Sequence, residues 1–124
     1  MKKILYILAV IALFTSCQKA DHNGDLGGFW KLQQIELAED GSVISKKQEN
    51  RFWAVQLDLI EIGNGKGRFQ HVGDSLYVQM ITKITSPNDY GIFNQEDERF
   101  GIIQLDRDRM ILRSKNATLT FSKF

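Results

Sequence analysis

The sequence predicts an all-β domain in which about eight antiparallel strands form an up-and-down barrel. From residue 28 onward, short segments rich in β-branched and aromatic residues are separated by turn residues. No long stretch carries the period of a helix, and most connections are as short as hairpins require. Because a meander with one apolar face can close on itself and remove its edges, a barrel is the expected architecture.

The N-terminal residues 1–16 have the pattern of a signal peptide. Lys2 and Lys3 form a positive start, and the apolar run over residues 4–14 has the length of a signal-peptide core. A transmembrane helix needs about 20 apolar residues, so this run is too short to be one. The small residues Thr15 and Ser16 then stand directly before Cys17.

This leader and its cysteine resemble the lipobox of bacterial lipoproteins. The resemblance implies that Cys17 carries a thioether-linked diacylglycerol and anchors the mature protein to a membrane of the cell envelope. Some bacteria place Asp directly after the cysteine as an inner-membrane retention signal. This chain has Gln18 there instead, so the resemblance favours the outer membrane, facing the periplasm. The alternative is an ordinary signal peptide with an incidental cysteine. Residues 17–26 lack apolar periodicity, so we expect a flexible tether before a domain at 27–124.

Within that domain we expect eight strands, at residues 28–37, 51–62, 67–72, 75–85, 90–93, 99–105, 109–113 and 117–124. The connections 63–65, 73–74, 106–108 and 114–116 are short and rich in turn residues. The longest connection, 38–50, is polar. Alternation breaks between Leu59 and Ile60, and we expect a β-bulge there, inside one continuous strand.

Gly28, Phe29 and Trp30 open the first expected strand. A Gly-x-Trp at the start of an eight-stranded meander resembles the lipocalin-like families, particularly short bacterial lipoproteins with this domain. The resemblance implies that Trp30 closes the base of the barrel beneath a basic residue near the last strand. Lys123 is the expected partner, with Arg113 as the second choice.

Charge and cysteine content exclude several classes of function. Lys2 and Lys3 account for two of the 16 basic residues, which leaves 14 in the mature chain against 15 acidic ones. Without a basic field, the chain is not expected to bind nucleic acid. Cys17 is the only cysteine, so no internal disulfide can form and the core alone must stabilise the domain.

The sequence predicts no catalytic site, no metal site and no cofactor. His22 and His71 lack ligand neighbours at metal-binding spacing. The glycine-rich segment 63–67 lacks the helix and hydroxyl residue of a phosphate loop and is expected to be a hairpin. The acidic run at 96–98 is expected to be a solvated loop, although paired carboxylates could serve acid–base chemistry.

Two functional interpretations remain open. In the first, the barrel holds a small apolar or amphiphilic ligand against inward side chains, and the candidate lining residues are Trp53, Val55, Leu57, Tyr77 or Val78, Met80, Phe93 and Ile103. Thr82 and Gln104 are candidate polar anchors inside such a pocket. Ordinary core packing explains the same apolar pattern equally well.

In the second interpretation, the barrel is solid and serves as a protein-interaction module, such as an inhibitor or an accessory subunit of an envelope complex. Its contacts would come from exposed loop aromatics, with Tyr90, Phe93 and Phe100 as candidates beside the connection 86–89. The protein partner is not specified by the sequence. A filled or hollow interior distinguishes the two interpretations.

Overall fold

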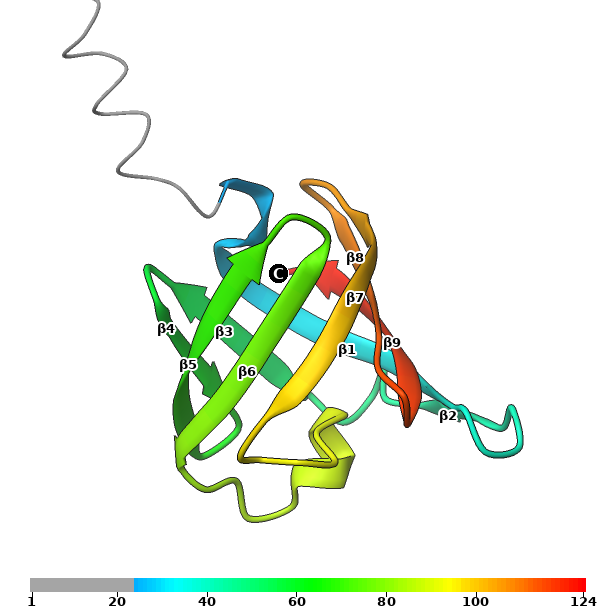
Figure 1. The fold of residues 1–124 in the computed structure, drawn as a ribbon. Helices are drawn as coiled ribbons and strands as arrows, with labels where there is room; N and C mark the ends of the chain where they lie inside the picture. The colour runs from blue at the N-terminus through cyan, green and yellow to red at the C-terminus, as the bar shows by residue number, and fades with distance from the viewer. Residues whose placement is uncertain (1–23) are drawn as a thin grey trace, which may run out of the picture.

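The chain folds into a closed antiparallel barrel, shown in Figure 1. The structure is a computed structural model that describes residues 24–124. The expected signal peptide, Cys17, His22 and most of the expected tether lie outside the described residues. No helix among residues 24–124 is long and apolar enough to cross a membrane.

The described residues form nine strands and two short 3-10 helices. In chain order these are η1 (Gly24–Leu26), β1 (Gly28–Leu37), β2 (Val43–Ser45), β3 (Phe52–Gln56), β4 (Leu59–Ile62), β5 (Gly65–Val72), β6 (Ser75–Thr82), η2 (Pro87–Tyr90), β7 (Glu98–Leu105), β8 (Arg109–Arg113) and β9 (Ala117–Lys123).

Eight of these strands, β1 and β3 to β9, make the barrel, and each pairs antiparallel with its neighbour along the chain. The barrel closes where β1 pairs with β9, in a register that joins Trp30 to Lys123 and Leu37 to Ala117. The short β2 pairs with the far half of β1, at Gln34–Glu36, and lies outside the closed ring. The predicted up-and-down, eight-stranded barrel is therefore confirmed.

The barrel interior is a packed hydrophobic core. Side chains alternate between the two faces of each strand, so Trp53 and Val55 on β3 point inward while Gln56 is exposed. The Trp53 ring packs edge-on against Phe121, with centroids 4.8 Å apart, and against Phe100 at 5.7 Å. Large side chains from opposite walls therefore meet in the middle of the barrel.

The predicted continuous strand over 51–62 is wrong. The segment forms two strands, β3 and β4, that fold back on each other through a two-residue turn at Leu57 and Asp58. Leu57 has a φ of 55°, in the left-handed region that favours glycine. The reversal moves Leu59 to the outer face and Ile60 to the core, which explains the break in alternation without a bulge.

The predicted strand at 90–93 is also wrong. Residues 87–90 form η2, and the whole stretch 83–97 is a long connection that crosses the lower end of the barrel in Figure 1. We call residues 83–97 the mouth segment. The expected strand 75–85 ends at Thr82, the expected strand 67–72 begins earlier, at Gly65, and the expected connection 38–50 contains β2.

Candidate functional site

The two ends of the barrel are closed in different ways. At the end where η1 joins β1, Trp30 is fully buried and its indole Nε1 donates a hydrogen bond to the Leu26 carbonyl at 2.8 Å. The Lys123 ammonium lies 4.3 Å from the centroid of the Trp30 ring. Lys123 Nζ also donates hydrogen bonds to the carbonyls of Asp25, at 3.1 Å, and Gly27. We call this the tether end.

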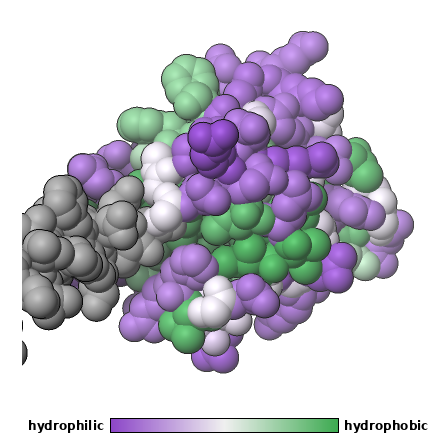
Figure 2. Space-filling model, turned by 90° about the horizontal axis from the view of Figure 1, so that it is seen from above, coloured by the Kyte–Doolittle hydropathy of each residue, from purple (hydrophilic) through white to green (hydrophobic). Residues whose placement is uncertain are grey.

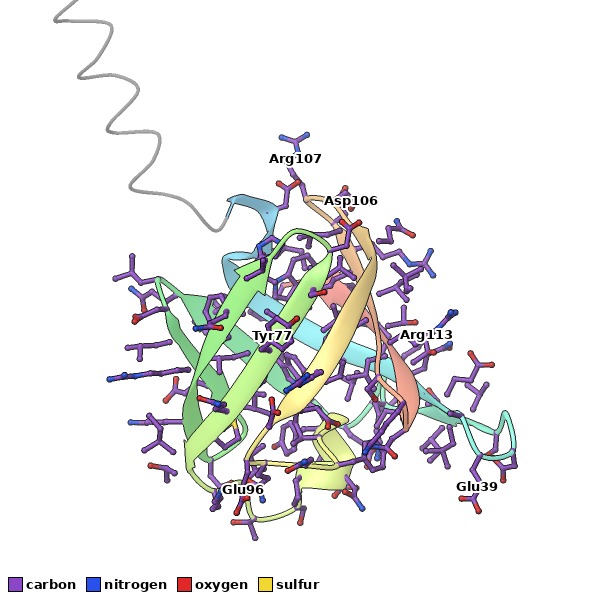
Figure 3. All side chains as sticks on the ribbon, in the orientation of Figure 1. Glu39, Tyr77, Glu96, Asp106, Arg107 and Arg113 are labelled. Atoms are coloured by element: carbon purple, nitrogen blue, oxygen red, sulfur yellow. The ribbon has the colours of Figure 1, made fainter. Side chains whose placement is uncertain are left out.

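Gly28 allows the lysine to approach this closely. Its φ is 116°, which L side chains rarely adopt, and a Cβ there would lie 3.0 Å from Lys123 Cε. The structure thus brings together Gly28, Trp30 and Lys123, the three residues expected at the closure. Arg113, the second choice, lies on β8 with its side chain exposed (Figure 3).

The opposite end, which we call the mouth, is closed by the mouth segment rather than by a strand residue. Ile84 and Ile92 are 3% and 0% exposed and belong to the core. Gly91 follows η2 with a φ of 85°, and a Cβ on it would come within 2.5 Å of Leu119 Cδ1. The segment therefore sits tightly on the core at the point where η2 ends.

The barrel wall is incomplete beside this segment. β6 and β7 pair only between Ser75–Val78 and Glu98–Gly101, although β6 continues to Thr82. Figure 1 shows these two strands diverging toward the lower end. Gln95 bridges the gap: its carbonyl accepts from the Met80 amide at 2.7 Å, and its side chain exchanges two hydrogen bonds with the Ile84 backbone, at 2.6 and 3.2 Å.

Further side-chain contacts attach the mouth segment to β3 and to the connection between β2 and β3. Trp53 Nε1 donates to the Tyr90 carbonyl at 3.0 Å. The Arg51 guanidinium lies 5.1 Å from the Tyr90 ring centroid and 3.7 Å from Asp89. The buried Lys46 reaches Asp89 at 3.5 Å. These contacts hold the segment mainly through side chains.

A buried carboxyl group supports the return of the chain into β7. Glu98 is 2% exposed, and its Oε1 accepts a hydrogen bond from the Phe93 amide at 3.0 Å. Burial raises the pKa of the Glu98 carboxyl above its ordinary value, and the Phe93 amide offsets part of that shift. The acidic run at 96–98 is thus not wholly solvated, because Glu98 is part of the interior.

The candidate lining residues divide into three groups. Trp53, Val55, Val78 and Met80 point inward, where they form part of the packed core. Phe93 is partly buried at the mouth, and Tyr77 is half-buried on the outer face beneath Arg99.

Leu57 and Ile103 were expected to line the interior, and this expectation is wrong. They are 57% and 52% exposed. Leu57 occupies the β3–β4 turn, and Ile103 lies at a register shift between β7 and β8 that interrupts the alternation.

Three further expectations about side-chain direction fail. Phe100, expected in an exposed loop, is 2% exposed in the core. Thr82 and Gln104, expected as inward polar anchors, lie on the outer surface.

A surface hollow of about 450 Å³ adjoins the mouth segment. It is lined by Leu37, Ala38, Glu39, Phe93, Lys115 and Asn116. Of these residues, sequence reasoning singled out Phe93 as a candidate lining residue. Leu37 ends β1 and residues 115–116 lie in the β8–β9 turn, so only the closed topology brings them to Phe93. Apolar side chains with amide and charged groups at the rim suit an amphiphilic molecule.

The comparisons with known proteins agree with this geometry. The sequence profile of the lipocalin-like domain matches residues 12–124. The chain belongs to the lipocalin-like family. No curated protein matches it.

Two solved structures resemble this lipocalin-like fold. A lipocalin-like protein from Bacteroides uniformis has a TM-score of 0.69 and 18% identity, over 82% of this chain and all of that one. An uncharacterized protein from Bacteroides eggerthii has a TM-score of 0.62 and 16% identity, over 79% of this chain and 98% of that one. At these identities both likenesses concern the fold.

The glycine-rich segment 63–67 of this lipocalin-like domain forms a turn that contacts the mouth segment. Residues 63–64 form the β4–β5 turn, and Asn64 exchanges two hydrogen bonds with Thr85, at 2.5 and 3.0 Å. The expected hairpin at 63–67 is therefore present. His71 is exposed on β5, and residues 24–124 contain no group of three potential metal ligands.

Proposed function

We propose that this protein is a lipoprotein of the bacterial cell envelope whose lipocalin-like barrel binds a small apolar or amphiphilic ligand at the mouth. The anchor would be the lipid on Cys17, and the role would be binding rather than catalysis. The observation that carries the proposal is the unpaired seam between β6 and β7, covered by a segment that inserts Ile84 and Ile92 into the barrel end.

The packed interior sets a condition on this function. The surface hollow beside Phe93 can receive part of a ligand without rearrangement, but a pocket of roughly 300 Å³ or more inside the barrel has to come from displaced side chains, because the core is filled. The mouth segment can move without breaking the β6–β7 ladder, since β6 beyond Val78 has no β7 partner. Its outward movement would open a space bordered by Trp53, Met80 and Phe93.

The contacts that hold the segment are individually modest. A typical hydrogen bond contributes about 0.5–1.5 kcal/mol net, and an exposed ion pair about 0–1 kcal/mol. Re-exposing each isoleucine costs a further 1.5–3 kcal/mol or so. A ligand that buries apolar surface in the same place offsets that cost. The ligand then takes the place of the Ile84 and Ile92 side chains at the barrel end.

A binding titration tests this proposal. The mature chain with Cys17→Ser is titrated with a fluorescent fatty acid, beside Gln95→Ala and the matched control Gln104→Ala, whose glutamine bonds Asp106 on the surface. Loss of the Gln95 side-chain bonds raises the open population, so Gln95→Ala should bind about 2–10-fold more tightly. Equal affinity in Gln95→Ala and Gln104→Ala, or no binding in any chain, contradicts the proposal.

Anchoring is tested separately by the intact mass of the protein made in a lipoprotein-processing bacterium. A mature chain that begins at Cys17 and carries the mass of the acyl groups supports the anchor. The Cys17→Ser chain should lack that mass and leave the membrane fraction. A wild-type chain cleaved elsewhere and free of lipid contradicts the anchor.

The second candidate function is a solid protein-interaction barrel, and the filled interior favours it. Trp30, Trp53 and Phe121 are fully buried and leave the centre occupied. Under this alternative no small amphiphile binds, and the hydrogen-bonded amides of Ile84, Ile92 and Phe93 exchange with solvent as slowly as those of the β1–β9 ladder. Fast exchange of these three amides together with binding excludes it.

A further inference from the structure

Apolar side chains gather on the outer face of the barrel at the tether end. Phe29 and Leu57 are 59% and 57% exposed, and both line a hollow of about 500 Å³ beside Gly24 and Gly27. Phe124, which is 82% exposed, donates its amide to the Phe29 carbonyl at 2.9 Å. We call the set Phe29, Phe52, Ala54, Leu57 and Phe124 the tether-end patch.

The patch is continuous across strands. Phe29 and Ala54 are register partners in the β1–β3 ladder, and Phe52 lies two residues before Ala54 on the same face. The Phe124 ring packs edge-on against Phe52, with centroids 5.1 Å apart. Beyond Ala54 and Gln56, a second hollow of about 340 Å³ continues the apolar surface to Leu59 and Ile81. Scattered apolar residues are ordinary on a surface, but a connected set of aromatic ones indicates an interaction site.

The position of the tether-end patch fits a lipid bilayer as its partner. Cys17 precedes Gly24 by seven positions, and a fully extended chain spans at most about 3.3–3.6 Å per residue. A lipid on Cys17 therefore holds Gly24, which lines the same hollow as Phe29 and Leu57, within about 25 Å of the bilayer. Figure 2, which views this end, shows hydrophobic residues at the surface among hydrophilic ones.

Charge does not compete with this apolar contact. Asp106 and Arg107 lie together at the upper end in Figure 3, and Lys31 shares the outer face of β1 with Phe29. Charges of both signs therefore lie at this end of the barrel, so attraction to anionic headgroups is not the main contribution to membrane binding. Aromatic and leucine side chains in such a setting partition into the boundary between headgroups and acyl chains.

We propose that the tether-end patch docks on the lipid bilayer, so that the barrel rests on the membrane by this face with its mouth turned away. The inference rests on the proposed lipidation of Cys17. The tether supplies a high effective concentration, which makes a weak insertion sufficient. The membrane then fixes the orientation of the mouth toward the aqueous compartment.

Spin labels on the lipidated full chain in vesicles of phosphatidylethanolamine and phosphatidylglycerol test the docking. Because Cys17 is the only native cysteine and would carry the lipid, Gln56→Cys introduces a single thiol beside the patch. Ser45→Cys is the matched control, on exposed β2 at the far half of β1. Collision rates with oxygen and with a water-soluble nickel chelate give the depth of each label.

The label at position 56 should lie at a depth of about 5–10 Å and the label at 45 in water, in vesicles with or without the anionic lipid. Adding Phe29→Ser and Phe124→Ser, both at exposed positions, should return the label at 56 to water while the chain stays lipidated. If the lipidated chain leaves positions 56 and 45 equally exposed to the chelate, the docking is overturned and the anchor stands. If the chain carries no lipid, both the docking of the patch and the anchor on Cys17 are overturned.

Discussion

Lys123 and Trp30 are register partners in the β1–β9 ladder, and the lysine ammonium lies 4.3 Å from the centroid of the indole ring. The same ammonium donates to the carbonyls of Asp25, inside η1, and of Gly27, directly after it. One side chain therefore joins the last strand, the first strand and the 3-10 turn at the place where the barrel closes.

Replacing Trp30 by alanine should destabilise the domain by about 3–5 kcal/mol, because a fully buried indole and its hydrogen bond to Leu26 are lost. Urea unfolding followed by circular dichroism measures this change. Phe29→Ala, next to it on the exposed face, is the control and should cost under about 1 kcal/mol. If Trp30→Ala lowers the free energy of unfolding by less than about 1 kcal/mol, Trp30 does not contribute to closing the barrel.

Lys123→Met should lower the free energy of unfolding by about 1–3 kcal/mol, since the cation–π contact and the bonds to two carbonyls disappear while the apolar stem remains. Lys123→Arg keeps the charge and should lose less. Lys83→Met, at an exposed position in the mouth segment, serves as the control. Equal losses at positions 123 and 83 would show that the closure does not depend on this lysine.

Glu98→Gln should change how stability depends on pH. The raised pKa of Glu98 means that the folded chain retains a proton that the unfolded chain has released, so stability falls as pH rises from the ordinary glutamate value through the folded pKa. Glutamine keeps an oxygen for the Phe93 amide and does not titrate. The difference in unfolding free energy between Glu98→Gln and wild type should therefore grow across that window. A constant difference contradicts the burial effect.

Leu57→Gly should stabilise the protein by about 0.5–1 kcal/mol. A left-handed leucine costs about 1–2 kcal/mol, and the entropy of an added glycine removes about half of that gain. Leu59→Gly, two residues later inside β4, should instead destabilise by roughly 1 kcal/mol. Thermal unfolding of the two variants decides the sign, and a loss of stability in both would refute strain at the turn.

Much of the fold follows from local patterns. The expected strands at 28–37 and 109–113 have the observed bounds. Residues 109–113 alternate cleanly between exposed and buried positions, whereas the pairing of β1 with β9 shifts register between Leu32 and Gln34. The Leu57–Asp58 turn escaped prediction because its leucine lacks the turn chemistry of glycine or asparagine. Apolar residues on both sides of this turn made two strands look like one.

The mouth could not be predicted from the sequence. Tyr90, Ile92 and Phe93 have the composition of a strand, yet the segment is held by Trp53, Glu98 and the Met80 amide, all contributed by other strands. Such contacts depend on the closed topology, which no local window contains. The same holds for Ile103, since a register shift set by pairing with β8 turns it outward.

Mapping a bound amphiphile by nuclear magnetic resonance tests the central claim most directly. A fatty acid titrated into the Cys17→Ser chain should shift the amides of Ile84, Ile92 and Phe93 and speed up hydrogen exchange at Met80, while the β1–β9 ladder stays unchanged. Shifts confined to Leu59 and Ile81 on the outer face, with the mouth segment unaltered, would contradict ligand binding at the mouth.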